Sequence, residues 1–479
     1  MSNTSESTRK PTAEQQAIID AAISGGNLVI QAGAGTGKTS TLEMIAEALA
    51  PMKILYLVYN RAAKDEAEVK LAHLPTVTVK TTHGLAFATH GRKYQRRFKV
   101  RMNAKVVAST LGATWLNLAD DLSLSPARLA SITQATLKRF CYSADSDITG
   151  SHVPFQNGIT GGNHEQLKSI VLPLARRYWE DAKNVNGILP FNMDYYLKMY
   201  ALSNPHIDAE VVFLDEAQDS NPCVANLVRN QTHAQQIVVG DGCQQMYAWR
   251  GAVDALATWP NAEQLYLTQS WRFGEAIAEE ANRWLSQLDT PLRLSGNPAL
   301  DSVVETIEPG TEDAILCRTN GGAMGSVMSL INQGKKVALV GGGEALASLA
   351  SAALDLMGGR RTSHAELYAF KSWAEVRDYV EGDENAGDLK TMVKLIDDHG
   401  PAVIIETTKA LVPEGQATVV VSTAHKAKGR EWDSVRLGGD FFTPTKGEQM
   451  ASAEIMIAYV AVTRAKLVLD CSSLVSDVA

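Results

Sequence analysis

The sequence predicts an α/β protein with two parallel-sheet cores, each carrying a mostly helical insertion. Short apolar runs that are typical of buried strands alternate with helix-like segments, and strands separated by helices pair in parallel. This alternation occurs twice, before and after about residue 268, and each time a stretch without strand-like runs interrupts it. The chain has 479 residues, which is long enough for two or three domains.

The first core is predicted from six short apolar runs. A mostly helical and polar stretch, with a glycine-rich patch at 149–163, separates the first three runs from the others. We therefore expect residues 11–88 and 205–267 to form this core, residues 89–204 to form a helical insertion, and residues 1–10 to be a disordered lead. The predicted strands are Leu28–Gln31, Lys53–Tyr59, Thr76–Thr81, Val211–Leu214, Gln236–Val239 and Gln264–Leu267.

The second core begins where the same alternation resumes, after Trp271. We expect residues 268–342 and 415–479 to form it. The segment 343–414 between them looks helical and is interpreted as a second, reduced insertion of about 70 residues. The predicted strands are Ala314–Cys317, Lys336–Val340, Thr418–Ser422, Ser434–Leu437 and Leu467–Cys471.

Composition excludes several classes of protein. The net charge of −8 argues against a generally basic nucleic-acid binder, so any such site must be a local groove. The five cysteines include no C-x-x-C pair, which indicates reduced thiols and no zinc or iron–sulfur site. No apolar run reaches the ~18 residues of a membrane span, and the polar start lacks the apolar core of a secretion signal. We expect an intracellular protein of the cytoplasm, nucleoid or nucleus that is not secreted.

A glycine-rich loop follows the apolar run 28–30 and precedes a helix-like stretch at 42–50. Strand, loop and helix in this order form a phosphate-binding loop, whose backbone N–H groups point at phosphate oxygens. Lys38 is expected to reach the phosphates, and the Thr39 hydroxyl to hold Mg²⁺. A plain surface turn would leave this Lys-Thr pair unexplained, so the loop predicts nucleotide binding. Its residues are Ala32, Gly33, Ala34, Gly35, Thr36, Gly37, Lys38 and Thr39.

Two adjacent carboxylates, Asp215 and Glu216, follow the apolar run 211–214. A strand end beside a phosphate loop is the expected place for a carboxylate that holds Mg²⁺, and we assign this role to Asp215. Glu216 is our candidate general base, which orients and deprotonates the attacking water. The alternative is an acidic helix N-terminus, where Asp and Glu are common.

Four further side chains are candidates for the same chemistry. Gln244 lies just beyond an apolar run and is placed to sense the γ-phosphate or the water. Trp249 suits stacking on an unpaired base, although core packing is the commoner role of such a residue. Arg272 and Arg464 lie in the second core and are candidates for stabilising the transition-state charge. Taken singly, each arginine is more often part of a surface ion pair.

The order of these motifs resembles the superfamily 1 DNA helicases of the UvrD/Rep type. That resemblance implies two RecA-like cores of the P-loop NTPase class, with ATP and Mg²⁺ as cofactors. It also implies a monomeric motor that moves 3′ to 5′ on single-stranded DNA, acts at single-strand/duplex junctions, and serves repair, recombination or replication. The segments that carry it are Thr12–Gln15, Ala32–Thr39, Tyr56–Ala63, Thr81–Gly84, Asp215–Asp219, Gly240–Gly251, Thr268–Arg272, Ile315–Asn320, Val421–Trp432 and Tyr459–Arg464.

The resemblance also implies roles for individual residues. Gln15 and Trp271 correspond to adenine contacts, Glu431 faces the nucleotide, and Arg272 and Arg464 reach the phosphates. A further group corresponds to the family's DNA contacts, which are mostly to phosphates, with bases stacked on aromatics. In this chain those residues are Asn60, Arg61, Thr82, His83, Trp249, Thr423 and His425.

The amino-acid sequences of three segments are similar to those of the F-box DNA helicase branch. These segments are Tyr195–Met199, Thr268–Gly274 and His425–Gly429. No F-box-like segment precedes them, so we expect the resemblance to cover the motor part alone. Arg430 stands where the family usually has leucine. The sequence leaves any protein partner unidentified.

Three rival functions remain open. The reduced insertion 343–414 favours a translocase that strips proteins from single strands and separates duplex poorly. An RNA helicase is a second rival, although the motif wording points to DNA. A non-catalytic ATP-gated scaffold is the third, and the presence of Lys38, Glu216, Gln244, Arg272 and Arg464 argues against it.

The segment 92–101 is unusually basic, with six basic and two aromatic residues in ten. One interpretation is that it grips duplex or single-stranded nucleic acid at the start of the first insertion. The other is a solvated basic face of a helix. The sequence favours neither.

Overall fold

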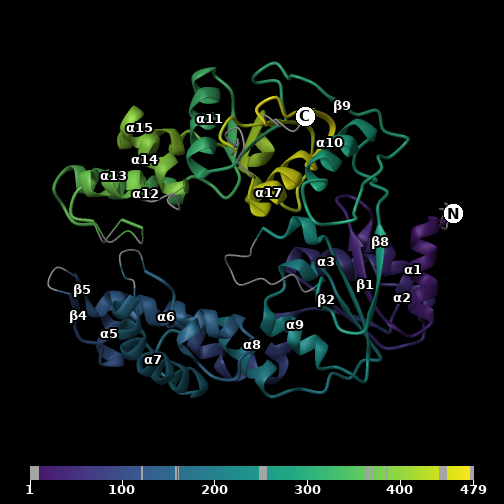
Figure 1. Ribbon diagram of the computed structural model, residues 1–479, viewed down its shortest axis with the longest axis horizontal. Helices are drawn as coiled ribbons and strands as arrows, with labels where there is room; N and C mark the ends of the chain where they lie inside the picture. The colour runs from purple at the N-terminus through teal and green to yellow at the C-terminus, as the bar shows by residue number, and fades with distance from the viewer. Residues whose placement is uncertain are drawn as a thin grey trace. The chain divides into compact units, whose positions relative to one another are not determined.

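A computed structural model describes residues 10–119, 122–156, 159, 161–246, 256–362, 364, 366–367, 370–382, 387–441 and 450–474. The chain divides into two compact units. The first unit comprises residues 1–32 and 38–267, and the second comprises residues 33–37 and 268–479. Each unit contains one six-stranded sheet, and each is described separately below (Figure 1).

The first sheet is parallel throughout and has the strand order β3-β2-β6-β7-β1-β8. Neighbours in the sheet are therefore distant in the sequence, as crossover connections through helices require. All six predicted strands are confirmed to within two residues at either end. They are β1 (Asn27–Ala32), β2 (Ile54–Val58), β3 (Val77–Thr81), β6 (Val211–Leu214), β7 (Gln235–Gly240) and β8 (Ala262–Leu267).

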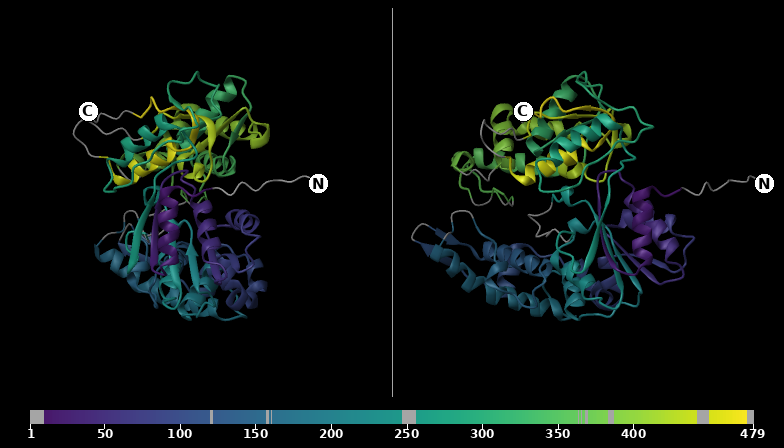
Figure 2. Two further views of the ribbon diagram at one scale, coloured as in Figure 1. Left: turned by 90° about the vertical axis from the view of Figure 1, so that its right-hand side faces the viewer. Right: turned by 45° about the vertical axis from the view of Figure 1, so that its right-hand side comes forward.

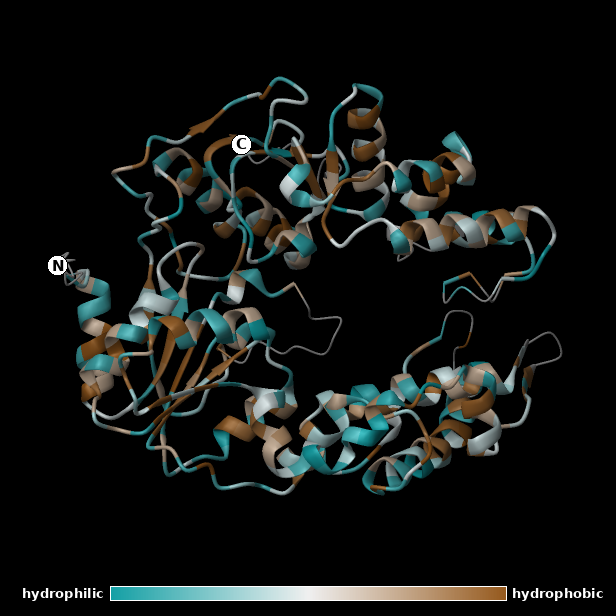
Figure 3. Ribbon diagram, turned by 180° about the vertical axis from the view of Figure 1, so that it is seen from behind, coloured by the Kyte–Doolittle hydropathy of each residue, from teal (hydrophilic) through white to brown (hydrophobic). Residues whose placement is uncertain are grey.

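Both faces of this sheet are covered, which explains why its central strands, such as β2 and β6, are almost continuously apolar. Helices α1 (Ala13–Ile23), α2 (Lys38–Ala48) and α3 (Arg61–Lys70) share one apolar cluster with alternate strand residues, such as Ile30. The intervening residues, such as Val29, belong to a second cluster that contains α9 (Pro222–Arg229) and much of the first insertion. Figure 2 shows the purple α1 and α2 against the strands, and Figure 3 shows the mainly apolar colouring of the central strands.

The start of α1 is fixed by a reciprocal cap. The Thr12 hydroxyl accepts a hydrogen bond from the Gln15 backbone N–H at 3.1 Å. The Gln15 side-chain oxygen accepts one from the Thr12 backbone N–H at 3.0 Å. Two of the backbone donors at the helix start are thereby satisfied, so the segment Thr12–Gln15 has a structural role in addition to any role at a nucleotide.

The first insertion is mostly helical, as predicted. It also contains a short antiparallel hairpin that the sequence analysis did not predict, in which Leu116 pairs with Leu124. Its strands are only four and three residues long, so their period-2 signal is weak. The elements between β3 and β6 are α4 (Thr82–Ala86), η1 (Phe87–Gly91), η2 (Arg92–Lys99), α5 (Ala104–Leu111), β4 (Leu116–Ala119), β5 (Leu122–Leu124), α6 (Pro126–Tyr142), η3 (Gly150–His152), α7 (Gly161–Lys183) and α8 (Met193–Leu202).

The basic segment 92–101 divides into buried and exposed parts. Arg97 is 3% exposed, and its guanidinium donates to the Asp181 carboxylate and to the backbone carbonyls of Asp181, Asn184 and Leu189. It therefore caps the C-terminal end of α7. Tyr94 is also buried and stacks on Phe191 with ring centroids 4.6 Å apart. Arg97 and Tyr94 therefore neither grip nucleic acid nor belong to a solvated basic face. For the exposed basic residues of the segment, both of these interpretations remain open.

We predict that Arg97→Ala lowers the free energy of unfolding by about 3 kcal/mol, because it leaves the enclosed Asp181 carboxylate without its cation. Urea unfolding followed by tryptophan fluorescence measures this change. Arg96→Ala removes the same charge from an exposed position and is expected to change stability by less than about 0.5 kcal/mol. Equal losses in the two variants would contradict the structural role of Arg97.

The second sheet is also parallel, with the order β11-β12-β10-β13-β14-β9. Five of its strands match the predicted ones within two residues. The two-residue strand β9 was not predicted, because so short a segment carries no periodicity. The strands are β9 (Val303–Val304), β10 (Ala314–Cys317), β11 (Val337–Leu339), β12 (Val419–Thr423), β13 (Trp432–Leu437) and β14 (Ala465–Asp470). The two sheets with their helices confirm the predicted fold class of two RecA-like cores.

The helices of segment 343–414 share one apolar cluster with the second sheet. Leu346, Trp373, Ile396 and Ile404 belong to the same cluster as Val421 of β12. This segment is therefore packed onto the core rather than built around a separate core of its own. Its helices are α12 (Glu344–Met357), α13 (Trp373–Gly382), α14 (Gly387–His399) and α15 (Pro401–Lys409). The other helices of the unit are α10 (Glu275–Leu285), α11 (Asn320–Asn332), α16 (Ala424–Ala427) and α17 (Ser452–Val462).

Within the described part of the chain, no helix has both the length and the apolar composition that a membrane span needs.

Candidate active site

The phosphate-binding loop lies where the sequence predicts it, between the end of β1 at Ala32 and the start of α2 at Lys38. Gly35 and Gly37 have φ angles of +74° and +82°, a conformation that residues with a Cβ rarely adopt. A Cβ on Gly33 would lie 2.2 Å from a Leu294 methyl carbon, and one on Gly35 would lie 2.6 Å from the Arg272 Cβ. Backbone shape and close packing both require glycine in this loop.

Lys38 supplies the positive charge among the carboxylates of this site. Its Nζ lies 2.8 Å from Glu216 Oε1, and Asp215 and Asp241 also act on it. Burial alone lowers the pKa of the Lys38 ammonium, but the attraction of Glu216, Asp215 and Asp241 outweighs this and raises it. Lys38 therefore stays charged and is held among three carboxylates.

Asp215 follows the last residue of β6, and both of its carboxylate oxygens are held. Oδ1 accepts a hydrogen bond from the Glu216 backbone N–H at 2.8 Å, and Oδ2 accepts one from the Tyr56 hydroxyl at 2.8 Å. Burial first, and then the neighbouring Glu216, raise the pKa of the Asp215 carboxyl to about 6. Each oxygen keeps a further lone pair for a ligand.

These residues fit a divalent cation. One lysine ammonium does not neutralise the three carboxylates Asp215, Glu216 and Asp241, and carboxylate and hydroxyl oxygens are the ligands that Mg²⁺ prefers. Thr39, the second residue of α2, supplies a half-buried hydroxyl. The donor set therefore agrees with the assignment of Asp215 and Thr39 as candidate ligands.

Glu216 has an unusual backbone, with φ +49° in the left-handed region. A non-glycine residue is strained there, and such strain is concentrated at functional sites. The Gln218 side-chain amide donates to Glu216 Oε2, while its oxygen accepts from the Asp241 backbone N–H at 3.1 Å. A Cβ on Gly240 would lie 2.0 Å from that oxygen, so glycine makes room for the link.

Gln244 is 5% exposed, and its amide donates to Asp241 Oδ2 at 2.7 Å. Asp241 follows the end of β7 and is fully buried. Gln218 thus connects the carboxylates after β6 with the Asp241–Gln244 pair after β7. A role at this site was not predicted for Gln218 and Tyr56, although both are polar side chains among buried apolar neighbours. That combination is a signal for a hydrogen-bonded role.

In the second unit, Arg272 and Arg464 both contact Thr463, and Glu431 pairs with Arg272. Arg272 Nε lies 2.6 Å from Glu431 Oε2, and its Nη1 donates to the Thr463 carbonyl at 3.0 Å. Arg464 is 1% exposed and donates to the Val460 carbonyl and to the Thr463 hydroxyl. Three residues that the sequence named separately therefore form one group of contacts.

Two more contacts involve the loop residues of the second unit. The Trp271 backbone N–H donates to the Gly35 carbonyl at 2.8 Å, while the indole side of this residue is 49% exposed. The Tyr459 hydroxyl accepts from the Ala34 N–H at 3.1 Å. An exposed indole anchored beside the loop is suited to stacking on a base.

Arg430 is half-buried and forms an ion pair with Glu414. Glu414 ends the segment 343–414, so this arginine ties the segment Val421–Trp432 to the adjoining end of the reduced insertion. The pair gives a structural reason for an arginine at this position.

Gln15 is buried and committed to protein contacts. Besides the cap at α1, its Nε2 donates to the Thr41 hydroxyl at 3.1 Å. The amide has a second N–H, so a contact to adenine is compatible with both bonds. Its role at a nucleotide stays a prediction.

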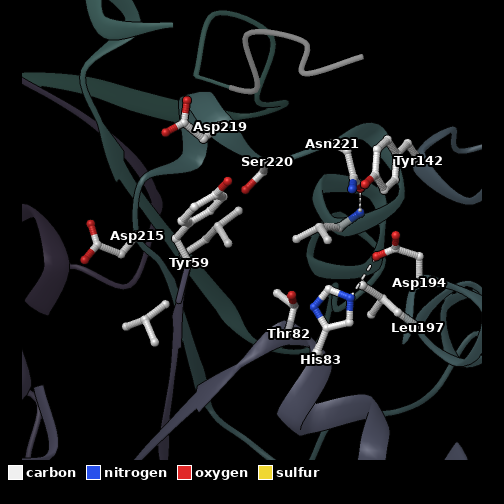
Figure 4. Close-up of a pocket in the computed structure, with 13 residues that line it drawn as sticks. Tyr59, Thr82, His83, Tyr142, Asp194, Leu197, Asp215, Asp219, Ser220 and Asn221 are labelled. Atoms are coloured by element: carbon white, nitrogen blue, oxygen red, sulfur yellow. Dashed lines mark hydrogen bonds and ion pairs between the residues drawn. The ribbon is translucent and has the colours of Figure 1, made fainter. Parts of the chain in front are cut away.

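Thr82 and His83 line a cavity of about 280 Å³ at the carboxyl ends of β2, β3 and β6. Tyr59 and Asp215 are on its wall as well, and His83 Nε2 lies 2.9 Å from Asp194 Oδ1 of α8 (Figure 4). The structure thus brings two predicted DNA contacts to the same edge of the sheet as the carboxylates.

The other predicted DNA contacts are placed less uniformly. Asn60 and Arg61 are exposed at the start of α3, where the Asn60 side chain caps the helix. Thr423 is 6% exposed and caps α16, and His425 follows it half-buried. Trp249 lies outside the described residues.

Comparison with known proteins identifies the family of this chain. Residues 12–257 match the family model described as the UvrD/REP helicase N-terminal domain. The match covers just over half of the chain, and the chain belongs to the UvrD/REP helicase family, whose members are DNA helicases that use a nucleotide. The resemblance predicted from the motifs is thereby confirmed.

Two relatives extend the comparison. The chain is 30% identical to F-box DNA helicase protein 1 of Schizosaccharomyces pombe, over 96% of this chain and 57% of that protein. It is 29% identical to F-box DNA helicase 1 of Gallus gallus, over 95% of this chain and 48% of that protein. The chain thus spans about half the length of these two relatives.

We predict that Lys38→Ala weakens the binding of a fluorescent adenine nucleotide at least about tenfold, because it removes the cation that faces the phosphates. The variant should also melt at a lower temperature, since the three carboxylates around Lys38 lose the cation that attracts them. Fluorescence titration and a thermal melt measure the two effects. Lys64→Ala, which breaks a pair with Glu68 on α3, is the control and should leave nucleotide binding unchanged.

Proposed function

We propose that this chain is an ATP-driven motor that moves 3′ to 5′ along single-stranded DNA and unwinds duplex DNA ahead of it. The observation that carries the proposal is the set Lys38, Asp215, Glu216 and Gln244 at the carboxyl ends of neighbouring parallel strands. This set combines a phosphate-binding cation, a candidate Mg²⁺ ligand, a candidate base and a sensor amide. Membership of a DNA helicase family supports the choice of DNA as the substrate.

In the proposed reaction, the loop N–H groups and Lys38 bind the phosphates of ATP. The γ-phosphate gives Lys38 a new anionic partner, which releases Glu216 from its 2.8 Å ion pair to accept a proton from the attacking water. Arg272 and Arg464 stabilise the negative charge that develops on the phosphate. Asp215 and Thr39 would hold Mg²⁺, which would supply further charge neutralisation at the phosphates. Trp271 and Gln15 contact adenine.

DNA is proposed to cross the edge where the strands β2 and β3 end. Thr82, His83, Asn60 and Arg61 contact the backbone there, while Thr423 and His425 contact it from the second core. Trp249 stacks on a base. We assign residues 89–204 to the insertion of the first core and residues 343–414 to that of the second. The motor is proposed to act as a monomer in DNA repair, recombination or replication.

A translocase that strips bound proteins without efficient unwinding is the second candidate. One observation favours it: segment 343–414 shares its apolar cluster with the second sheet, so this chain has a compact insertion at that position. A compact insertion offers less surface for duplex DNA.

Strand separation on matched duplexes tests the main proposal. We expect ATP-dependent unwinding of a duplex with a 3′ single-stranded tail and none with a 5′ tail. ATPase activity that single-stranded DNA stimulates, with no unwinding of either substrate, would support the translocase instead. Stronger stimulation by single-stranded RNA than by DNA would contradict both.

We predict that Glu216→Gln lowers kcat for ATP hydrolysis by about a thousandfold or more, because an amide does not take the proton from water. Nucleotide affinity should be retained, since Lys38 and the loop are intact. Steady-state ATPase assays and nucleotide titration measure the two quantities. Glu68→Gln on α3 serves as the control, and turnover at the parental rate in Glu216→Gln would refute the assignment of the base.

A further inference from the structure

We propose that Tyr56 is a positioning residue of the ATP site, whose hydroxyl holds the Asp215 carboxylate in the orientation that Mg²⁺-nucleotide binding requires. The inference rests on the proposed function, because it takes Asp215 as the metal ligand. It assigns a role to a strand residue that has no place in the motifs of phosphate loop and acidic pair.

The sheet register explains why this position reaches Asp215. Tyr56 of β2 is opposite Phe213 of β6, and Asp215 lies two residues further along the chain, just after β6 ends. Two residues of strand span about 6.6 Å, a distance that a tyrosine side chain leaning along the strand covers. Its hydroxyl ends 2.8 Å from Asp215 Oδ2.

The ring and the hydroxyl of Tyr56 have separable roles. The ring is 1% exposed and meets Phe213 edge-on, with centroids 5.9 Å apart. Its neighbours along β2 are all aliphatic and buried, so a phenylalanine would satisfy the packing equally well. The hydroxyl adds a buried polar atom to an apolar strand, which costs free energy unless it is hydrogen-bonded. The Asp215 carboxylate accepts that hydrogen bond and so offsets the cost of burying the hydroxyl.

Two hydrogen bonds from different elements fix the Asp215 carboxylate. The backbone N–H of Glu216 holds Oδ1, and the Tyr56 hydroxyl holds Oδ2. The terminal torsion of an aspartate is soft, so one bond alone leaves the carboxylate plane poorly defined. Groups that orient a metal ligand in this way typically change metal affinity by 10- to 100-fold when they are removed.

Tyr56→Phe tests the proposal through binding rather than turnover. The affinity for the fluorescent nucleotide mant-ADP is measured in EDTA and over a series of Mg²⁺ concentrations. We expect an unchanged affinity in EDTA and an increase of about tenfold in the Mg²⁺ concentration that gives half of the Mg²⁺-dependent gain. A purely structural tyrosine would lower the melting temperature and leave the Mg²⁺ requirement unchanged.

Two control variants separate the explanations. Tyr178→Phe removes a buried hydroxyl that donates to the Pro190 carbonyl at 2.9 Å in the insertion, and it should leave the Mg²⁺ requirement unchanged. Phe213→Leu disturbs the ring contact but keeps the Tyr56 hydroxyl, so it should lower the melting temperature without a tenfold shift. If Tyr56→Phe fails to fold while Phe213→Leu folds, the hydroxyl serves folding and the proposal is overturned.

The outcomes distinguish this inference from the proposed function. Equal Mg²⁺ requirements in Tyr56→Phe and the unsubstituted chain would overturn the positioning role alone, because both would still bind nucleotide. If the unsubstituted chain showed no Mg²⁺-dependent nucleotide binding, both the proposed function and this inference would be overturned.

Discussion

The site depends on one arrangement of charge, in which the Lys38 ammonium is held among the carboxylates of Asp215, Glu216 and Asp241. The strand order β6-β7-β1 creates it, because the carboxyl ends of neighbouring parallel strands meet at the same edge of a sheet. Asp215 follows β6, Asp241 follows β7, and Lys38 follows the loop after β1. A close group of three carboxylates is stabilised by a cation among them, and the proposed phosphate binding requires the same cation. The same fold feature therefore serves both stability and the proposed function.

The fold was predictable where burial imposes a simple pattern. Strands that are buried on two faces, such as those at the centre of the first sheet, appear in the sequence as continuous apolar runs, and eleven strands of the two sheets were predicted within two residues. The hairpin β4–β5 and the strand β9 are too short to establish a period. Strand order was not predictable from local pattern, because β1 pairs with β7 and β8, more than 200 residues away.

The site was predictable where a motif is local, and less so where partners come from distant elements. Lys38, Asp215 and Gln244 were assigned from their own segments, and the structure groups them. Tyr56 and Gln218 were missed because their hydrogen bonds run between strands. Arg97 shows the opposite case: it lies in a basic run that suggests a surface, yet the shape of η2 turns it inward to cap α7. Charge in a sequence does not reveal which member of a run is buried.

Each of the candidate catalytic cations already has a partner within the protein, and this bears on the mechanism. Lys38 pairs with Glu216, Arg272 with Glu431, and Arg464 donates to its own helix end. Such a cation exchanges one partner for another with little change in free energy only if the new partner is also anionic or a strong hydrogen-bond acceptor. In the proposed reaction, the γ-phosphate would be such a partner for these cations. Phosphate binding and activation of the proposed base Glu216 would then be parts of one exchange of ion pairs.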